Sequence, residues 1–446
     1  MKGLLSSAVG ALIFACAALP AAALAADHPH PQSVYVNGKS YHWPVHATVV
    51  ILIDGNDPEY IKAGIRQGVL PNFKHLSEAG FATVALSAMP SFTNPNNISV
   101  ITGQPPAVHG ITGNYFLDPE SGQAVMMNQP QFVRAESILA AFSRQGAKVV
   151  ALTAKNKLAK MLASGINLEN GISFSSEKAD TCTKKDNGTE NCLAWMGRSS
   201  PPDIYSPDLS LAMLEAGLRI YGKEKPDLMY LSTSDYMQHT YAPGSQEAND
   251  FYAGMDRVIG RLVSLGATVA VTADHGMNDK SGPDGTPNVI FLQDVLDRVF
   301  GAGKTRVILP ITDPYVKHHG ALGSYATVFI RDSGLKATDV MAVIAREQGV
   351  DMVMERYAAA RNFELPPDRI GDLIVSADRH TVIGGRQSEH DLTKLAGHRL
   401  RSHGGLSDRN TYLMFSRPLN DAYAAIAASR RLRNYDAFDF ALNGLK

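Results

Sequence analysis

Net charge is almost absent from this chain. Its 42 lysine and arginine residues nearly balance 43 aspartate and glutamate residues, which gives a formal net charge of −1 over 446 residues. No stripe of basic residues stands out along the sequence, so the electrostatic footprint that nucleic-acid binding requires is missing. We therefore expect a small-molecule substrate and no nucleic-acid partner.

Internal repeats and low-complexity linkers are also absent, while hydrophobic residues make up 45 % of the chain. A chain of this length and composition can bury a large core. This favours one large domain with a smaller inserted one.

Long hydrophobic runs are confined to the first residues. The stretch "MKGLLSSAVGALIFACAALPAAALAAD" begins with a lysine, continues with an apolar run and ends in small residues. This pattern predicts a signal peptide over residues 1–26, and hence a periplasmic or secreted protein. A membrane anchor is the alternative, but the run is short for a bilayer span and contains Pro20, so we expect no stable membrane anchor.

Cysteine is scarce, since only Cys16, Cys182 and Cys192 occur. Removal of the signal peptide would remove Cys16. The other two flank a polar segment with an Asp-Asn-Gly turn signal. In an oxidising compartment we expect them to form a structural disulfide, with two free surface thiols as the alternative.

Short apolar β-branched runs alternate with amphipathic helical runs from residue 47 onward. Strands are expected at 47–55, 81–89, 147–154, 226–235 and 267–276, and helices at 58–68, 135–146, 208–224 and 246–266. Apolar strands separated by helices specify a mostly parallel sheet with helices on both faces. The predicted fold class is therefore α/β.

A later section of the chain has a different pattern. Residues 286–394 mix short strand-like and helical runs with many turns. We expect them to form an inserted α+β cap. Residues 45–285 and 395–446 would then form the core.

Three of the expected strands end in acidic residues. Asp54 follows one, Asp235 and His239 follow another, and Asp274 and His275 follow a third. Open parallel sheets bind ligands beyond the carboxyl ends of their strands. One such aspartate is often only a helix cap, but three on one rim would repel one another unless cations neutralised them. Aspartate and histidine without cysteine suit zinc, with manganese or iron as alternatives.

Another histidine ligand is expected near the C-terminus, in "HRLRSHGGLSDR". His403 precedes two glycines, which let the backbone approach a site closely. His390 and His398 are competing candidates, and spacing alone does not choose among the three.

Thr93 lies in "PSFTNPNNISVITG", at the start of an apolar helical segment. Taken alone it is best interpreted as an N-cap threonine. Beside a metal cluster the interpretation changes, because a metal lowers the pKa of a bound hydroxyl and a helix N-terminus attracts phosphoryl oxygens. Thr93 is then a candidate nucleophile.

Lys155 and Lys157 in "TAKNK" follow another expected strand. A solvated charged turn is the usual setting of such lysines. Residues two apart in an extended chain point to the same side. Two ammonium groups placed together need an anionic partner, and a substrate carboxylate would supply one.

Several motifs of this chain resemble the alkaline phosphatase superfamily and, within it, the phosphonoacetate hydrolase branch. The resemblance rests on "LIDGNDPEY", "PSFTNPNNISVITGQPPAVHGITGNYF", "TAKNK", "STSDYMQHTY", "TADHGM" and "RSHGG". These motifs extend over nearly the whole mature chain. The resemblance implies an alkaline-phosphatase-like central sheet with an inserted α+β cap.

The resemblance also implies two zinc ions per subunit. It assigns one metal to Asp54, Asp274, His275 and Thr93, and the other to Asp235, His239 and His403. It thereby favours His403 over the two competing histidines. All seven positions are present in this sequence.

The substrate implied by the resemblance is a small phosphonate. Thr93 would attack phosphorus and form a phosphothreonine intermediate, Asn114 would donate to a phosphonate oxygen, and His239 would also contact the substrate. Lys155 and Lys157 would hold the carboxylate of phosphonoacetate, which spreads the charge released when the carbon–phosphorus bond breaks. The products would be acetate and phosphate.

Two other functions remain alternatives. A nucleotide pyrophosphatase/phosphodiesterase of the same superfamily would use the same metals and threonine, with an aromatic nucleobase slot. A periplasmic phosphonate-binding protein would bind without turnover. The sequence leaves open whether the chain is a monomer or a homodimer.

Replacing the nucleophile distinguishes a hydrolase from a binding protein. In Thr93→Ala, phosphate release from phosphonoacetate should fall by about four orders of magnitude, because the attacking oxygen is lost. Phosphonate binding, measured by calorimetry, should largely survive. A wild-type protein that binds phosphonoacetate and releases no phosphate would instead identify a binding protein.

Overall fold

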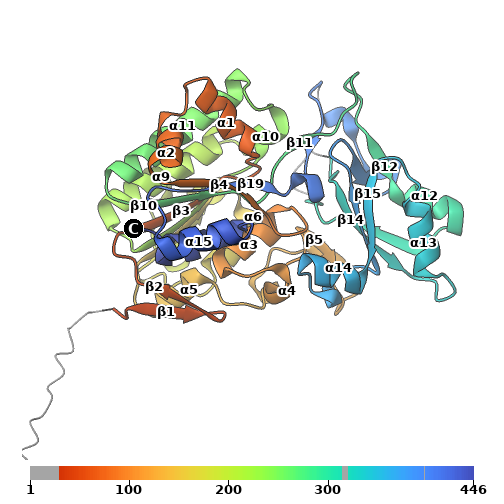
Figure 1. Cartoon of the computed structure of the whole chain (residues 1–446), viewed down its shortest axis with the longest axis horizontal. Helices are drawn as coiled ribbons and strands as arrows, with labels where there is room; N and C mark the ends of the chain where they lie inside the picture. The colour runs from red at the N-terminus through yellow and green to blue at the C-terminus, as the bar shows by residue number, and fades with distance from the viewer. Residues whose placement is uncertain (1–29, 314–319, 396) are drawn as a thin grey trace, which may run out of the picture.

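A computed structural model describes residues 30–313, 320–395 and 397–446 (Figure 1). The predicted signal peptide over residues 1–26, with Cys16, lies outside the described residues and stays a prediction. Among the helices in the described ranges, none has both the length and the apolar character that a bilayer span requires.

A seven-stranded sheet forms the centre of the larger part of the molecule (Figure 1). Its strand order is β4-β19-β10-β3-β9-β7-β8, and only β19 runs against the others. The strands are β3 (Thr48–Leu52), β4 (Phe81–Leu86), β7 (Val149–Thr153), β8 (Ile172–Ser175), β9 (Leu228–Ser232), β10 (Thr268–Thr272) and β19 (Asn410–Phe415). The predicted mostly parallel α/β sheet is confirmed, with β8 and β19 as additional strands.

Helices cover both faces of this sheet because its central strands are apolar on both sides. In β3, Val49 and Ile51 belong to one hydrophobic core, while Val50 and Leu52 belong to the other. The first core contains residues of α1 (Pro58–Arg66), α2 (Pro71–Ala79), α8 (Cys192–Met196), α9 (Asp208–Glu224) and α11 (Gln246–Ser264). The second contains residues of α3 (Thr93–Thr102), α5 (Ile138–Arg144), α6 (Asn156–Ala163) and α16 (Ala437–Asn443).

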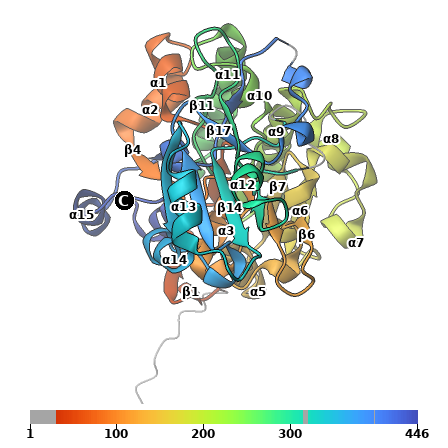
Figure 2. The ribbon, with the colours of Figure 1, turned by 90° about the vertical axis from the view of Figure 1, so that its right-hand side faces the viewer.

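A second, antiparallel sheet lies at the right of Figure 1 and faces the viewer in Figure 2. Its order is β13-β14-β16-β15, from β13 (Thr305–Ile308), β14 (Tyr325–Ile330), β15 (Val350–Glu355) and β16 (Leu373–Ala377). The helices in this part of the chain are α12 (Leu292–Phe300), α13 (Ala337–Ile344) and α14 (Arg356–Phe363). Phe92, which directly precedes α3, packs into the core of this second sheet. The second sheet is thus anchored beside Thr93.

Short pairs and helices complete the described structure. The pairs are β1 (Ser33–Val36) with β2 (Lys39–His42), β5 (Tyr115–Leu117) with β6 (Ala124–Met126), β11 (Asn278–Asp279) with β18 (Arg401–Ser402), and β12 (Val289–Phe291) with β17 (Val382–Gly384). The short helices are α4 (Pro106–His109), α7 (Lys184–Asn187) and α10 (Tyr236–Thr240), and α15 (Asp421–Ser429) lies near the C-terminus.

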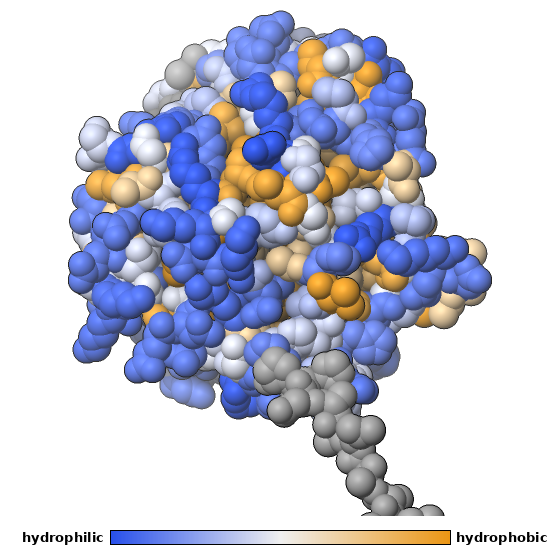
Figure 3. Space-filling view, turned by 90° about the vertical axis from the view of Figure 1, so that its left-hand side faces the viewer, coloured by the Kyte–Doolittle hydropathy of each residue, from blue (hydrophilic) through white to orange (hydrophobic). Residues whose placement is uncertain are grey.

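The face away from the second sheet is mostly hydrophilic, with a band of hydrophobic residues near its centre (Figure 3).

Large exposed hydrophobic side chains over the whole described part of the chain are Tyr35, Val45, Val69, Val108, Leu265, Val299 and Tyr357. They come from different segments. Scattered apolar side chains of this kind are normal on globular surfaces.

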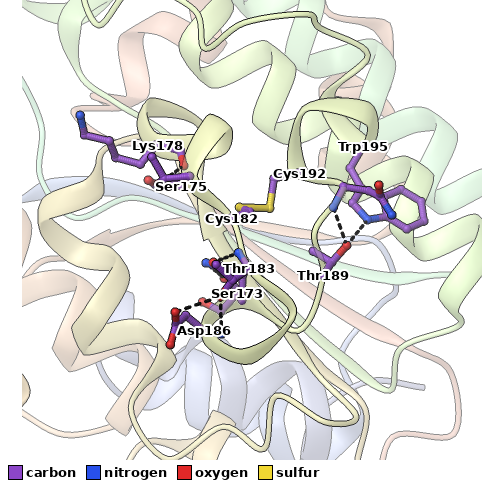
Figure 4. The surroundings of a disulfide bond; sticks show 12 residues. Ser173, Ser175, Lys178, Cys182, Thr183, Asp186, Thr189, Cys192 and Trp195 are labelled. Carbon is purple, nitrogen blue, oxygen red and sulfur yellow. Dashed lines mark hydrogen bonds between the residues drawn. A yellow bond between two sulfur atoms is a disulfide. The ribbon is translucent and has the colours of Figure 1, made fainter.

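The structure pairs Cys182 with Cys192 in a disulfide with an S–S distance of 2.04 Å (Figure 4). Cys182 directly follows the 3₁₀ helix η2 (Ser176–Thr181), and Cys192 begins α8. Within the closed loop, the Thr183 side chain accepts a hydrogen bond from the Asp186 N–H and caps α7. The disulfide therefore links the end of η2 to the start of α8, which packs against α9.

Loss of this disulfide should destabilise the fold without changing it. Cys182→Ser combined with Cys192→Ser should lower the free energy of unfolding by about 2–3 kcal/mol, because the short loop gains entropy in the unfolded chain. Equilibrium urea unfolding measures this. Cys16→Ser serves as the matched control and should leave the mature protein unchanged, whereas equal midpoints for all variants would contradict a stabilising role.

Candidate metal centre and active site

The candidate site lies beyond the carboxyl ends of adjacent parallel strands. Strands β10, β3 and β9 are neighbours in the sheet, and Asp274, Asp54 and Asp235 follow their last residues by two or three positions. All three carboxylates are at most 5 % exposed. The expected convergence of acidic residues on one rim is thus what the structure shows.

Two groups of side chains have the spacing of metal ligands. Asp235, His239 and His403 form one group, and Asp54, Asp235 and His275 form the other, with candidate ligand atoms within 4.8 Å of one another. Asp235 belongs to both groups. Asp274 lies next to the second, with its Oδ2 3.5 Å from His275 Nε2.

Each of the three histidines is oriented by a backbone carbonyl. Nδ1 of His239 lies 2.7 Å from the Arg401 oxygen, Nδ1 of His403 lies 2.7 Å from the Ser91 oxygen, and Nδ1 of His275 lies 2.9 Å from the Gly276 oxygen. A carbonyl oxygen only accepts, so each Nδ1 carries the proton and donates it. Each Nε2 then faces the carboxylates, at 3.0 Å from Asp235 Oδ2 for His239, 3.2 Å from Asp54 Oδ1 for His275 and 3.8 Å from Asp235 Oδ2 for His403. It is the ring atom that would bind a metal, with loss of any proton it carries.

Unsatisfied buried atoms indicate that a cation fits among these residues. Asp54 Oδ1, Asp274 Oδ2 and His275 Nε2 are buried without a hydrogen-bond partner. Nε2 of His275 lies 3.2 Å from Asp54 Oδ1 without the alignment of a hydrogen bond. Buried polar atoms normally find a partner, and a metal ion bound to all three would satisfy them.

The pKa values of Asp274, His275 and His403 are all shifted in this buried cluster. Burial and the neighbouring Asp54 raise the pKa of Asp274 well above its ordinary value. Burial lowers the pKa of His275, but Asp274 and Asp54 outweigh it and raise that pKa to about 9. Burial, followed by His275 and His239, holds the pKa of His403 well below its ordinary value. The cluster thus has an excess of negative charge that a cation would offset.

Thr93 is the first residue of α3 and does not cap it. The N-cap position belongs to Phe92, and no side chain forms the capping hydrogen bond. Thr93 is 3 % exposed, and its neighbours contact the metal-ligand groups, since the Phe92 ring lies edge-on to His403 at 5.5 Å. The N-cap interpretation is therefore wrong, and the hydroxyl is left for another role.

Asn114 has one side of its amide occupied. Its Oδ1 accepts a hydrogen bond of 3.0 Å from the backbone N–H of Asn94, in the first turn of α3. This fixes the amide beside Thr93 and leaves the Nδ2 group to donate. The same contact uses one N–H of the helix N-terminus, and Pro95 has no N–H, so fewer backbone donors remain at this helix end.

Lys155 and Lys157 follow β7, the strand next to β9. Nζ of Lys155 lies 2.9 Å from Asp235 Oδ1, and Nζ of Lys157 lies 3.0 Å from Asp313 Oδ2. Burial lowers the pKa of Lys155, but Asp235 and Asp54 outweigh it and raise that pKa, so its ammonium stays charged. Both lysines line the same cavity beside the metal-ligand groups.

The competing histidines lie elsewhere. Both ring nitrogens of His390 are used by backbone groups, at 2.8 Å from the Gly320 oxygen and 2.9 Å from the Gly385 nitrogen. His398 packs edge-on to Tyr241 at 6.1 Å. Neither belongs to a metal-ligand group in the described part of the chain.

Asp408 and Lys280 are supporting residues that sequence reasoning missed. Their side chains form a fully buried ion pair of 3.1 Å. Asp408 also accepts a hydrogen bond of 3.1 Å from the Gly405 N–H. Lys280 follows His275 by five residues and Gly405 follows His403 by two, so this pair joins the two segments that carry ligand histidines. Nothing in the sequence associates the two charges.

Comparison with known proteins places these residues in a family context. The family model of type I phosphodiesterases / nucleotide pyrophosphatases matches residues 48–405. The crystal structure of phosphonoacetate hydrolase from Sinorhizobium meliloti in complex with phosphonoformate superposes with a TM-score of 0.87 at 46 % sequence identity, covering 92 % of this chain and 98 % of that chain. The same enzyme in complex with phosphonoacetate gives the same TM-score.

Curated sequences match over shorter stretches. An uncharacterised pyrophosphatase/phosphodiesterase of Schizosaccharomyces pombe is 25 % identical over 249 residues, 51 % of this chain and 44 % of its own length. A phosphonoacetate hydrolase sequence of Penicillium oxalicum is 46 % identical over 46 residues, 10 % of this chain and 64 % of its own length. The chain thus spans less than half the length of the longer relative.

Metal binding can be tested without an activity assay. Adding zinc to chelator-treated protein should raise the unfolding temperature by about 3–6 °C when free zinc exceeds the dissociation constant about 100-fold. Asp274→Asn should lose most of this rise, because the amide carries no charge. Asp256→Asn is the matched control, since Asp256 is a buried carboxylate that accepts from the Phe73 N–H instead. An equal rise in both variants would contradict the assignment of Asp274.

Proposed function

The chain belongs to the type I phosphodiesterase / nucleotide pyrophosphatase family and, within it, to the phosphonoacetate hydrolases, and on this premise we propose that it hydrolyses the carbon–phosphorus bond of phosphonoacetate to acetate and phosphate. The observation that carries the proposal is the placement of Lys155 and Lys157 on one cavity beside the metal-ligand groups. Hydrolysis of an ordinary phosphate ester needs no such pair. A substrate with a carboxylate next to the scissile bond does need positively charged groups to bind that carboxylate.

The proposed resident metals are two zinc ions per subunit, with manganese or iron(II) as alternatives. Asp54, Asp274, His275 and Thr93 would hold one, and Asp235, His239 and His403 would hold the other. Aspartate oxygens and histidine Nε2 atoms form a donor set that suits zinc. When bound, such ions supply positive charge to the phosphonate oxygens and lower the pKa of the Thr93 hydroxyl.

The chemical steps proposed for the chain itself begin at Thr93. Its Oγ1 attacks phosphorus, the carbon–phosphorus bond breaks, and the electron pair leaves with carbon. Asn114 Nδ2 donates to a phosphonate oxygen, while its Oδ1 stays fixed by the Asn94 N–H. Attack by water on the resulting phosphothreonine then releases phosphate and restores the hydroxyl.

In the proposed reaction, Lys155 and Lys157 stabilise the carbanion that leaves when the carbon–phosphorus bond breaks. A free carbanion is a far worse leaving group than an alkoxide, but next to a carboxylate its charge spreads onto the carboxylate oxygens. Preorganised ammonium groups stabilise charge where it develops. Protonation of carbon then completes acetate.

Two architectural assignments accompany the proposal. Residues 286–394 would act as a cap on the core formed by 45–285 and 395–446. Support comes from Asp313, which lies in that segment and reaches Lys157 on the core. Export through a signal peptide over residues 1–26, to the periplasm or outside the cell, is supported by the disulfide between Cys182 and Cys192.

A nucleotide pyrophosphatase/phosphodiesterase activity is the second candidate function. The similarity to the relative from Schizosaccharomyces pombe favours it, and Tyr205 supplies an aromatic ring on the cavity wall. The ion-paired Lys155 and Lys157 have no evident task in such a reaction. A phosphonate-binding protein without turnover would not need the Thr93 hydroxyl, which lies at the start of α3 beside the candidate metal ligands and does not cap the helix.

Removing the lysine pair tests the carboxylate role. In Lys155→Ala combined with Lys157→Ala, kcat/KM for phosphonoacetate should fall at least about 100-fold, because two charge-assisted contacts are lost. Activity on an aryl phosphate ester should largely survive. Phosphate and acetate release from zinc-loaded and chelator-treated protein provide the assay, with a nucleotide diester as comparison.

Equal losses on the phosphonate and the ester would argue against the carboxylate role. Faster turnover of the nucleotide diester than of phosphonoacetate by the wild type would favour the second candidate function. Each result is independent of the other.

A further inference from the structure

A cavity of about 340 Å³ opens beside the metal-ligand groups. Lys155 and Lys157 form part of its wall, and none of the seven proposed metal ligands lines it. A phosphonate held by those ligands would therefore lie outside the cavity, with only the carboxylate reaching into it. Pockets of about 300 Å³ and more typically hold ligands much larger than an acetate group. Most of this space has no occupant in the proposed reaction.

The remaining wall of the cavity carries additional positive charge. Lys160 and Lys178 both line it, and both are exposed, with no carboxylate partner among residues 30–313, 320–395 and 397–446. Lys160 lies three residues after Lys157 on α6, and hence on the same side of that helix. Figure 4 shows the Lys178 side chain extending away from the disulfide.

Acidic groups of the cavity have other partners. Asp313 pairs with Lys157, and Glu177 accepts a hydrogen bond of 2.8 Å from the Asn156 N–H at the start of α6. That hydrogen bond also brings η2, which carries Lys178, against α6, which carries Lys160. The two exposed ammonium groups are therefore available to an anion that enters from solvent.

The order of strands arranges the charged groups in a line. Asp235 follows β9, Lys155 and Lys157 follow β7, and Lys178 follows β8, and these three strands are successive neighbours in the sheet. Adjacent strands are about 4.8 Å apart. A second anionic group would thus meet Lys178 one strand farther from phosphorus than the first carboxylate.

The chemistry of the bond limits where that second group can be attached. The carbon that leaves phosphorus must carry a carboxylate, because otherwise the released charge has no place to spread. A longer chain between phosphorus and carboxylate would break this conjugation. A branch on the α carbon keeps the first carboxylate on Lys155 and Lys157 and can extend toward Lys160 and Lys178.

We propose that the site accepts phosphonoacetates substituted at the α carbon with a short arm that ends in a second carboxylate, held by Lys160 and Lys178. This inference rests on the proposed function. With 2-phosphonosuccinate as the probe, water adds to phosphorus through the phosphothreonine, the electron pair of the broken bond stays on carbon, and a proton from solvent completes succinate. The products are succinate and phosphate.

A nucleobase is the competing occupant of the cavity. Tyr205 is its only aromatic wall residue in the described part of the chain, and that ring packs edge-on against Tyr236 at 5.7 Å. Among the described residues, no second ring lines the cavity to enclose a base between two faces. The two exposed lysines therefore favour a carboxylate over an uncharged base.

The experiment compares two substrates on the zinc-loaded mature protein. The wild type should release phosphate from both phosphonoacetate and 2-phosphonosuccinate. In Lys160→Ala combined with Lys178→Ala, the ratio of kcat/KM for 2-phosphonosuccinate to that for phosphonoacetate should fall about tenfold, mainly through KM, since two solvent-exposed ion pairs are lost. Added salt should reduce the difference in this ratio between the wild type and the double variant, because it screens exposed charges.

Two controls separate the subsite from general effects. Lys185→Ala removes an exposed lysine in the loop between Cys182 and Cys192, which does not line the cavity, and should leave the ratio unchanged. Calorimetric binding of both ligands to zinc-loaded Thr93→Ala protein, with and without the double lysine change, should reproduce the tenfold difference without turnover.

The possible failures are distinguishable. Absence of phosphonoacetate cleavage would refute the proposed function itself. Cleavage of phosphonoacetate with neither binding nor cleavage of 2-phosphonosuccinate, or with an unchanged ratio in the double variant, would overturn only the subsite. Preferred cleavage of a nucleotide diester that is lost in Tyr205→Ala would overturn it in favour of a nucleobase.

Discussion

Repulsion among buried carboxylates is the constraint on which the rest of the site depends. Asp54, Asp235 and Asp274 follow three adjacent strands and are nearly inaccessible to solvent. Burying like charges together is costly unless opposite charge lies close by. Histidines turned by backbone carbonyls and the ammonium of Lys155 offset part of this cost. The remaining negative charge would favour binding of divalent cations.

The parallel sheet converts this local constraint into an ordered site. From β10 through β3 and β9 to β7 and β8, the residues after each strand change from candidate metal ligands to ion-paired lysines and then to an exposed lysine. Candidate metal ligands, ion-paired lysines and open cavity therefore follow one another in one direction across the rim. Phe92 packs into the core of the second sheet, and Asp313, five residues after β13, pairs with Lys157, so the segment with the second sheet contacts the chain beside Thr93 and the lysines.

Local patterns made much of this predictable from the sequence. Strand β3 and helix α9 could be found because a continuous apolar run and an amphipathic period identify each without any knowledge of distant residues. Ligand aspartates could be found because a strand end fixes its own position on the rim. Strand β19 was not predicted, because it follows the inserted segment, runs antiparallel to its neighbours and is not part of the alternating strand–helix pattern.

Contacts between distant segments were not predictable in the same way. The Lys157–Asp313 bond joins residues 156 apart, and the Lys280–Asp408 pair joins residues 128 apart. Each charge taken singly has the appearance of a surface residue. Thr93 was misleading for a related reason, because the cap position belongs to Phe92, whose ring packs into the core of the distant second sheet.

The disulfide between Cys182 and Cys192 affects which residues near the cavity can vary in sequence. It closes the intervening residues into a loop immediately after η2, and Asn187 of that loop donates to the Ser173 oxygen of β8, so the positions free to vary are the exposed ones that make no contact with β8. Insertions or substitutions between the two cysteines could accumulate during divergence while the lysine-bearing wall kept its place. The loop is thus where a homologous protein could acquire a new surface at small cost to its chemistry.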